Sequence, residues 1–421
     1  MVKRPFYYGW IIVVLSFFSL AFLLGILSAF SVFYAALLDE FDWLRAESAG
    51  VISTSQIVYA LAAPCIGALI HRFGPRKVVV PGILVLGSGL ALCATVTSLA
   101  QFYVFYGLFV GIGASCISMA AFAVIISRWF DVNRGLANGI ASSGMGVGMF
   151  LLVPLSQTLI SKVGWQETYL VLALLVVVVL LPANLLFLKH RPQDMGLLPD
   201  GKKRNNPSDQ SHGSGRPSTP AAQWTWPILI RTPRFYAMML FPSLSIFSVM
   251  LIIVHNMRFF LDQGIDEMTG AYAIALAGMA TMVFRIVWGW LSDHVGREVA
   301  YTAGMVSLCI GIGCLLLLEN TGRPIFLYSF AVLFGMGWGA NAPIFAATAA
   351  DLFKGPRFGL LYGLVESLIG LAGALGAWAG GYIFDATHSY QPAFILTMAT
   401  ALLSATFIWL AAPRNAHRLR P

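Results

Sequence analysis

Charged residues are scarce in this sequence: Asp, Glu, Lys and Arg together make up 10% of its 421 residues. An ordinary soluble domain contains about 25%. Hydrophobic residues account for 58% of the chain instead. This balance excludes an ordinary soluble domain and indicates a protein that lies in a membrane.

Motifs for ATP hydrolysis or metal chemistry are also missing. The sequence contains no phosphate-binding loop of the Walker type and no His or Cys cluster with metal-ligand spacing. Its cysteines fall inside apolar stretches, where we interpret them as small buried residues; they are Cys65, Cys93, Cys116, Cys309 and Cys314. We therefore expect no cofactor, no metal and no enzymatic activity, and any transport must be driven by a gradient.

Long apolar runs, by contrast, are abundant. A helix needs about 20 such residues to cross ~30 Å of hydrocarbon. Runs of this kind begin near Trp10, Ser48, Val78, Phe102, Leu136 and Glu167, and again near Phe235, Met268, Val299, Pro324, Phe358 and Pro392. The first run continues to about Leu38 without a small-residue cleavage site, so we interpret it as an uncleaved span. The sequence predicts an all-α membrane protein with 12 transmembrane helices.

The apolar runs are interrupted once, between the sixth and the seventh. The interruption includes DGKKRNNPSDQSHGSGRPSTP, a stretch rich in Pro, Gly, Ser, Asn and charge. Such a composition buries too little apolar surface to order itself, which favours a flexible linker. We expect a six-helix bundle at 1–188, a cytoplasmic linker at 189–233 and a second six-helix bundle at 234–421.

The basic residues predict the orientation in the membrane. With the N-terminus in the cytoplasm, 21 of the 26 Lys and Arg fall in cytoplasmic segments, and four fall outside. This excess follows the positive-inside rule, so we expect a multi-pass protein of the plasma (bacterial inner) membrane with both termini cytoplasmic. The one remaining basic residue is Arg285, and one acid, Glu366, also lies within a span.

The two halves repeat each other at corresponding gaps. GALIHRFGPRKV after the second run matches GWLSDHVGREVA after the eighth, and WFDVNRGLANG after the fourth matches LFKGPRFGLLYG after the tenth. Repetition of a six-span unit is typical of transporters built from two pseudo-symmetric bundles. Basic and acidic residues in these loops can pair in one conformation and separate in another. The residues expected to form such conformational gates are Gly67, Arg72, Gly74, Arg76, Asp293, Gly296, Arg297, Arg134 and Arg357.

Over its whole length the chain resembles the major facilitator superfamily. The short loop G-x-x-x-D-R-x-G-R-R is that superfamily's signature, and Gly289, Asp293, Gly296 and Arg297 match it. The first-half copy has His71 at the position of the aspartate. The resemblance implies the major facilitator fold.

Within that superfamily the sequence is most similar to the monocarboxylate transporter and oxalate:formate antiporter group. The similarity rests on YYGW from Tyr7, SRWFDVNRGLANGIASSG from Ser127, Arg285 in span 8 and GLVES from Gly363. The resemblance implies that Arg285 binds the substrate carboxylate. Proton-coupled animal members carry an aspartate where this sequence has Thr281.

Arg285 is a charged residue in the middle of an apolar span. An ionised side chain at the centre of a bilayer costs from roughly 3 to more than 10 kcal/mol, so it marks a functional site. Its planar fork of donors suits a carboxylate. Arg285 and Glu366 lie eight and nine residues from charged groups at the cytoplasmic edge, which places both at a depth of about 12 to 14 Å. Glu366 is therefore either a structural ion-pair partner of Arg285 or a proton site.

Other polar residues within the spans are candidates of the same kind. His255, near the outer end of span 7, can titrate near neutral pH and is a second candidate for proton coupling. Tyr34, Ser118 and Asn341 can line a substrate cavity or join spans by hydrogen bonds. Glycines in two spans are spaced to let helices approach closely; they are Gly135, Gly139, Gly144 and Gly148 in span 5 and Gly373, Gly376 and Gly380 in span 11.

Taken together, these features predict a secondary active transporter for a small monocarboxylate or related organic anion. It is expected to work by alternating access, with H⁺ as the second partner, in the lipid bilayer, as a monomer and without nucleic acid. Two alternatives remain open: an anion exchanger of the oxalate and formate type, and a proton-driven exporter of drug-like molecules. A receptor on a transporter scaffold is less favoured because the tails are short.

Overall fold

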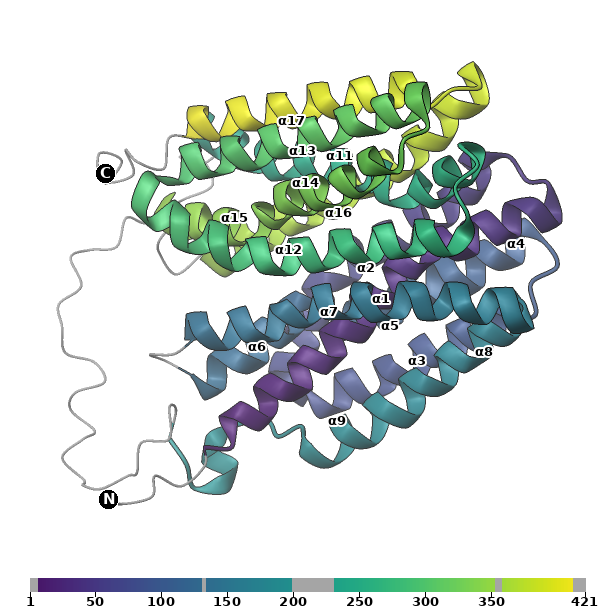
Figure 1. Ribbon diagram of the computed structural model, residues 1–421. Helices are drawn as coiled ribbons and strands as arrows, with labels where there is room; N and C mark the ends of the chain where they lie inside the picture. The colour runs from purple at the N-terminus through teal and green to yellow at the C-terminus, as the bar shows by residue number, and fades with distance from the viewer. Residues whose placement is uncertain (1–6, 131–133, 199–230, 353–357, 412–421) are drawn as a thin grey trace, which may run out of the picture.

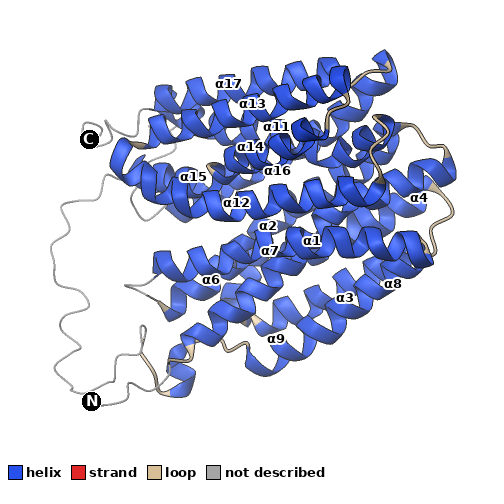
Figure 2. Cartoon of the chain, viewed as in Figure 1, coloured by secondary structure: helices blue, strands red, loops and turns tan. Residues whose placement is uncertain are grey.

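The computed structural model describes residues 7–130, 134–198, 231–352 and 358–411; the side chains at 63, 64, 71, 134–136, 350, 358–361 and 363 are not described. The predicted linker falls largely on 199–230, outside these ranges, so its flexibility stays a prediction. Within the described part every regular element is a helix (Figure 2).

The first bundle precedes the linker. Its helices are α1 (Gly9–Phe41), α2 (Arg45–Phe73), α3 (Arg76–Cys93), α4 (Leu99–Phe102), η1 (Tyr103–Val110), α5 (Gly111–Cys116), α6 (Met119–Trp129), α7 (Arg134–Val163), α8 (Trp165–Leu175), η2 (Val176–Leu180) and α9 (Leu181–Phe187). The elements from α4 to α6 form one span, as do those from α8 to α9. A short turn, η3 (Pro192–Met195), follows the bundle.

The second bundle repeats this plan. Its helices are α11 (Pro233–Asp262), α12 (Glu267–Val295), α13 (Arg297–Thr321), α14 (Pro324–Gly339), α15 (Asn341–Leu352), α16 (Phe358–Thr387) and α17 (Gln391–Ala411). Together α14 and α15 form one span, broken at Ala340. Figure 1 shows the two bundles side by side, which agrees with the two-bundle architecture expected from the repeats.

Eleven spans in the described residues are long and apolar enough to cross a membrane. The twelfth is α2, which has 29 residues but is more polar, with SAGVISTSQ at its first turns. Its polar side chains do not face lipid, because α2 packs against α16 of the other bundle. The polarity of α2 thus reflects its place at the interface between bundles.

The two ends of the molecule differ in how the bundles meet. We call the end that carries Gly9 and Ala411 the terminal face, and the opposite end the distal face. Two seams join the bundles, one between α2 and α16 and the other between α7 and α12, and α1 also contacts α11. The ribbons of the two bundles diverge toward the terminal face (Figure 1).

Glycines set the close packing within each bundle. A Cβ on Gly144 or Gly148 of α7 would collide with backbone carbonyls of α1, at Phe17 and Ala21. A Cβ on Gly376 of α16 would collide in the same way with Phe247 of α11. The predicted packing role is confirmed for these three glycines, which lie at corresponding helix pairs in the two bundles. It is wrong for Gly139, where a Cβ would meet no atom within 4 Å.

Candidate functional site

Arg285 lies on α12 and extends across the interface toward α7. One guanidinium nitrogen, Nη1, is 3.5 Å from the Ser142 carbonyl oxygen and 3.4 Å from the sulfur of Met145. The Nε atom is buried and has no hydrogen-bond partner in the described part of the protein. Within the same ranges no carboxylate lies within ion-pair distance of Arg285. The guanidinium is thus a partly buried cation whose buried Nε donor is unused within the described residues.

The backbone around Arg285 is held by two glycines of α14. A Cβ on Gly335 would meet the Ala277 carbonyl oxygen and the Ala280 side chain, and one on Gly339 would lie 3.1 Å from the Arg285 nitrogen. This close approach fixes α12 against α14 at the level of the arginine. The position of Arg285 is therefore set by main-chain packing and not by its own weak contacts.

Glu366 lies on α16, at the other seam. Its carboxylate is hydrogen-bonded to the hydroxyl of Tyr362, one turn earlier. Tyr59 of α2 lies close enough to interact with the same carboxylate, and its hydroxyl is hydrogen-bonded to Ser118. Next to this pair, the Ser367 hydroxyl donates to the Ala60 carbonyl oxygen at 3.4 Å. The carboxyl group therefore sits where the two bundles touch.

The ion pair between Arg285 and Glu366 that matching depth allows is not formed in this structure. Depth along the membrane normal does not fix position around the interface: Arg285 stands at the α7–α12 seam and Glu366 at the α2–α16 seam. Because each charged group has its own surroundings, neither is neutralised by the other here.

Ser118 and Asn341 mark the break in corresponding spans of the two bundles. Ser118 begins α6, where its hydroxyl accepts from the Ala121 nitrogen at 3.2 Å. Asn341 begins α15, and its Oδ1 accepts from the hydroxyls of Ser245 at 2.7 Å and Tyr301 at 3.1 Å. Through Tyr59, Ser118 belongs to the surroundings of Glu366. Within the described ranges Asn341 forms its hydrogen bonds with Ser245 and Tyr301, and none with Arg285.

Tyr34 and His255 lie together, and near the distal face. The Tyr34 hydroxyl is 3.2 Å from His255 Nδ1, which joins α1 of the first bundle to α11 of the second. Their described contacts do not include Arg285; they face Arg45, Tyr390 and Ala377 instead. Of the two roles expected for Tyr34, the structure shows a hydrogen bond between spans, and a role in lining a substrate cavity stays a prediction.

Around this pair is a set of charged residues that sequence reasoning did not single out. Arg45 Nη1 forms an ion pair with Asp262 at 2.6 Å and donates to the Tyr390 hydroxyl at 2.9 Å, while its guanidinium stacks 3.5 Å above the Phe384 ring. Arg258 forms an ion pair with Asp39 and, through Nε, with Asp262 at 3.1 Å. Asp385 accepts from the backbone nitrogens of Arg45 and Ala46. We call these residues the distal lock: Tyr34, Asp39, Arg45, His255, Arg258, Asp262, Asp385 and Tyr390.

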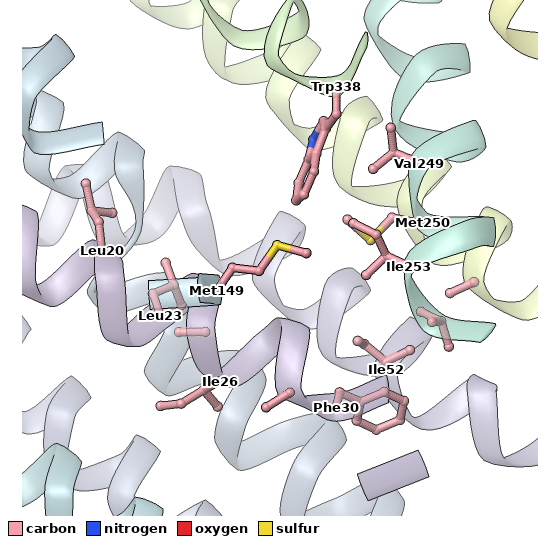
Figure 3. Close-up of a cluster of buried hydrophobic side chains, with 14 of the residues drawn as sticks. Leu20, Leu23, Ile26, Phe30, Ile52, Met149, Val249, Met250, Ile253 and Trp338 are labelled. Carbon is pink, nitrogen blue, oxygen red and sulfur yellow. The ribbon is translucent and has the colours of Figure 1, made fainter. Parts of the chain in front are cut away.

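Buried apolar side chains from both bundles form a cluster (Figure 3). Met149 of α7 points toward Trp338 of α14, and Leu23, Ile26 and Phe30 of α1 lie below it in the view. Ile253 and Met250 of α11 complete the cluster. Met149 is one turn beyond Met145, which contacts Arg285. Phe30 is likewise one turn before Tyr34 of the distal lock, so the cluster has neighbours of Arg285 on one side and of the lock on the other. Hydrophobic constrictions of this kind can close a pathway by excluding water.

The gate residues expected at the terminal face are partly described. Gly74 and Gly296 end α2 and α12 with φ of +88° and +96°, values that favour glycine. Arg297 forms ion pairs with Asp293 and with Asp351, the latter at 3.4 Å, all within the second bundle.

The other expected gate residues that the structure describes have few side-chain contacts. The Arg72 guanidinium lies 5.1 Å from the ring of Phe73, and Arg76 begins α3. Gly67, near the end of α2, has open space around its Cα. The side chain of Arg134 and all of Arg357 lie outside the described residues.

Comparison with known proteins identifies the family. The family model described as Major Facilitator Superfamily matches residues 9–355. The chain belongs to the major facilitator superfamily. It is therefore a membrane transporter and not an enzyme, and its described residues form two bundles with eleven long apolar spans and the more polar α2.

Relatives of this superfamily member include named carboxylate transporters. Monocarboxylate transporter 13 of Rattus norvegicus is 27% identical over 396 residues, which cover 94% of this chain and 87% of the relative. Monocarboxylate transporter 2 of Homo sapiens is 26% identical, with 96% and 84% coverage. An uncharacterized MFS-type transporter, YcxA of Bacillus subtilis (strain 168), is 25% identical, with 89% and 88% coverage.

Proposed function

We propose that this protein carries a small monocarboxylate across the cytoplasmic membrane by alternating access, together with H⁺. The observation that carries the proposal is Arg285: a partly buried guanidinium between the bundles, with a buried Nε donor that has no partner and no carboxylate within ion-pair distance among the described residues. A carboxylate can satisfy that donor and neutralise the charge at once. The names of the mammalian relatives support the same class of substrate.

The charge of the site supports a monoanion. Arg285 and Glu366 are the two formal charges deep within the spans. With Glu366 ionised and no substrate, their charges cancel. Binding of one monocarboxylate and one proton leaves the total at zero again, whereas a bound dianion leaves excess negative charge in the membrane, which is costly. We therefore assign proton uptake to Glu366.

The orientation follows from the distribution of Lys and Arg. We assign the terminal face, with both chain termini, to the cytoplasm, because 21 of the 26 basic residues then lie on that side. The distal lock and the apolar cluster then close the outer side. In this assignment the structure represents the conformation that releases or accepts substrate at the cytoplasmic face.

Binding of radiolabelled monocarboxylates to the purified protein tests the assignment of Arg285. Arg285→Gln removes the charge but keeps a polar side chain, and we expect it to lower affinity at least tenfold. Arg323→Gln, at the distal end of α14, is the matched control and should bind as the unsubstituted protein does. Equal binding by both variants would refute the site assignment.

A further inference from the structure

His255 has hydrogen-bond partners on both ring nitrogens, from both bundles. Nε2 is 2.9 Å from the carbonyl oxygen of Ala377 on α16. Nδ1 is 3.2 Å from the hydroxyl of Tyr34 on α1 and 3.4 Å from that of Tyr390. His255 is 2% exposed, so water does not replace these partners.

These contacts assign the tautomer. A carbonyl oxygen only accepts, so Nε2 must carry the hydrogen, and Nδ1 of a neutral ring must then accept. Two hydroxyl hydrogens, those of Tyr34 and Tyr390, serve two acceptors: His255 Nδ1 and the Arg45 carbonyl oxygen, which is 3.1 Å from the Tyr34 hydroxyl. With a neutral imidazole, donors and acceptors balance.

A second proton on the ring upsets this balance. Nδ1 then becomes a donor, and the Arg45 carbonyl is left as the one acceptor for two hydroxyl hydrogens. The added charge also lies near the Arg45 guanidinium, which donates to the same Tyr390 hydroxyl. A buried donor without a partner is costly, and a second buried cation beside it costs more.

The carboxylates of the distal lock are already engaged. Asp39 pairs with Arg258, and Asp262 pairs with both Arg45 and Arg258. Asp385 accepts from two nitrogens at the positive end of α2. Their negative charge is therefore balanced within the lock and does not require a cationic His255.

We propose that His255 is a proton-binding latch: the closed distal lock holds the neutral ring, and a proton that reaches Nδ1 from the distal side stabilises the distal-open conformation. The site is separate from Glu366, which lies at the α2–α16 seam, closer to the terminal face. This inference rests on the proposed orientation for its physiological meaning, in which external acid opens the outer face. The geometry of the latch itself does not depend on the substrate.

Spin labels on the distal face test the latch without any substrate. Lys162→Cys at the end of α7 and Thr321→Cys at the end of α13 are exposed and lie outside the lock, in a chain whose native cysteines are replaced by Ala. We expect the ratio of distal-open to distal-closed molecules to rise with acidity, by up to tenfold per pH unit for one proton. His255→Gln, which keeps an Nε2 donor but does not titrate, should abolish this response.

A matched control separates the latch from general acid effects. His388→Asn replaces an exposed histidine of the same face, at a position with φ of +54° that Asn tolerates, and should respond to pH as the unsubstituted chain does. A response that is absent in the unsubstituted chain, or that survives in His255→Gln, overturns the proposal. If His255→Gln does not fold, His255→Asn takes its place.

Two further measurements test the latch independently of transport activity. Nuclear magnetic resonance of the unsubstituted protein at alkaline pH reads the tautomer, and a hydrogen on Nδ1 instead of Nε2 would refute the latch. The label experiment repeated in Arg285→Gln should give the same pH response. A latch that works in a protein that transports no carboxylate would mean that the proposed function fails while this inference stands.

Discussion

Asp385, near the end of α16, caps the first turn of α2 in the other bundle: its Oδ1 lies 3.2 Å from the backbone nitrogen of Arg45, and its Oδ2 lies 2.7 Å from that of Ala46. The first nitrogens of a helix have no partner within the helix, so such a cap usually comes from the residue just before it. Here it comes from the opposite bundle, so separation of the bundles at the distal face would break the cap.

The cap predicts the effect of one substitution on the conformational equilibrium. Asp385→Asn keeps one acceptor oxygen but loses the charge at the positive end of α2. We expect the closed form to lose about 1 kcal/mol, roughly a fivefold shift toward distal-open molecules. The label pair at positions 162 and 321 measures this ratio; no shift would mean that the cap does not stabilise closure.

Arg285 should be sensitive to shape as well as to charge. Lysine keeps the charge but has no planar fork and is more strongly hydrated. We expect Arg285→Lys to raise the KM for the monocarboxylate at least tenfold, because the bidentate contact is lost. Steady-state uptake measures KM; an unchanged KM would indicate that a point charge is sufficient.

Glu366 should govern the response to a pH gradient. Glu366→Gln mimics the protonated carboxyl permanently, so we expect a loss of gradient-driven accumulation while exchange of internal for external carboxylate continues. Glu167→Gln, an exposed acid at the start of α8, is the control. Accumulation by Glu366→Gln that still follows the gradient would leave Glu366 with a structural role.

Helix packing gives a prediction about stability. A methyl group at Gly148 collides with the Ala21 carbonyl oxygen of α1, whereas one at Gly139 of the same helix meets no atom within 4 Å. Overpacking typically costs 1–3 kcal/mol, so we expect Gly148→Ala to lower thermal stability in detergent clearly and Gly139→Ala to have little effect. Equal melting temperatures would contradict the packing account.

Much of this fold is predictable from sequence, because crossing a bilayer demands long apolar helices and leaves few other structures. The interrupted repeat of six spans predicts the two bundles, and the glycine spacing of span 5 predicts a close helix contact, although only the structure shows that its partner is α1. The polar composition of α2 is consistent with this fold, because a span that packs against the other bundle can carry polar side chains that would be costly in contact with lipid.

The arrangement around the site is harder to predict. Counting residues along each span places Arg285 and Glu366 at the same depth in the membrane. It does not show which neighbouring helix each side chain faces, and in the structure the two residues lie at different seams. The distal lock was missed because Arg45, Asp39 and Arg258 look like ordinary charges at the ends of spans. Their pairing depends on residues more than 200 positions apart, which no local pattern reports.

The most direct test of the central claim is uptake of radiolabelled carboxylates into vesicles that contain the purified protein, with and without an inside-alkaline pH gradient. The account predicts that a monocarboxylate accumulates when the gradient is present, that dicarboxylates do not, and that Arg285→Gln abolishes accumulation. Uptake only against a preloaded internal anion would instead indicate exchange. Accumulation that persists in Arg285→Gln would contradict the account.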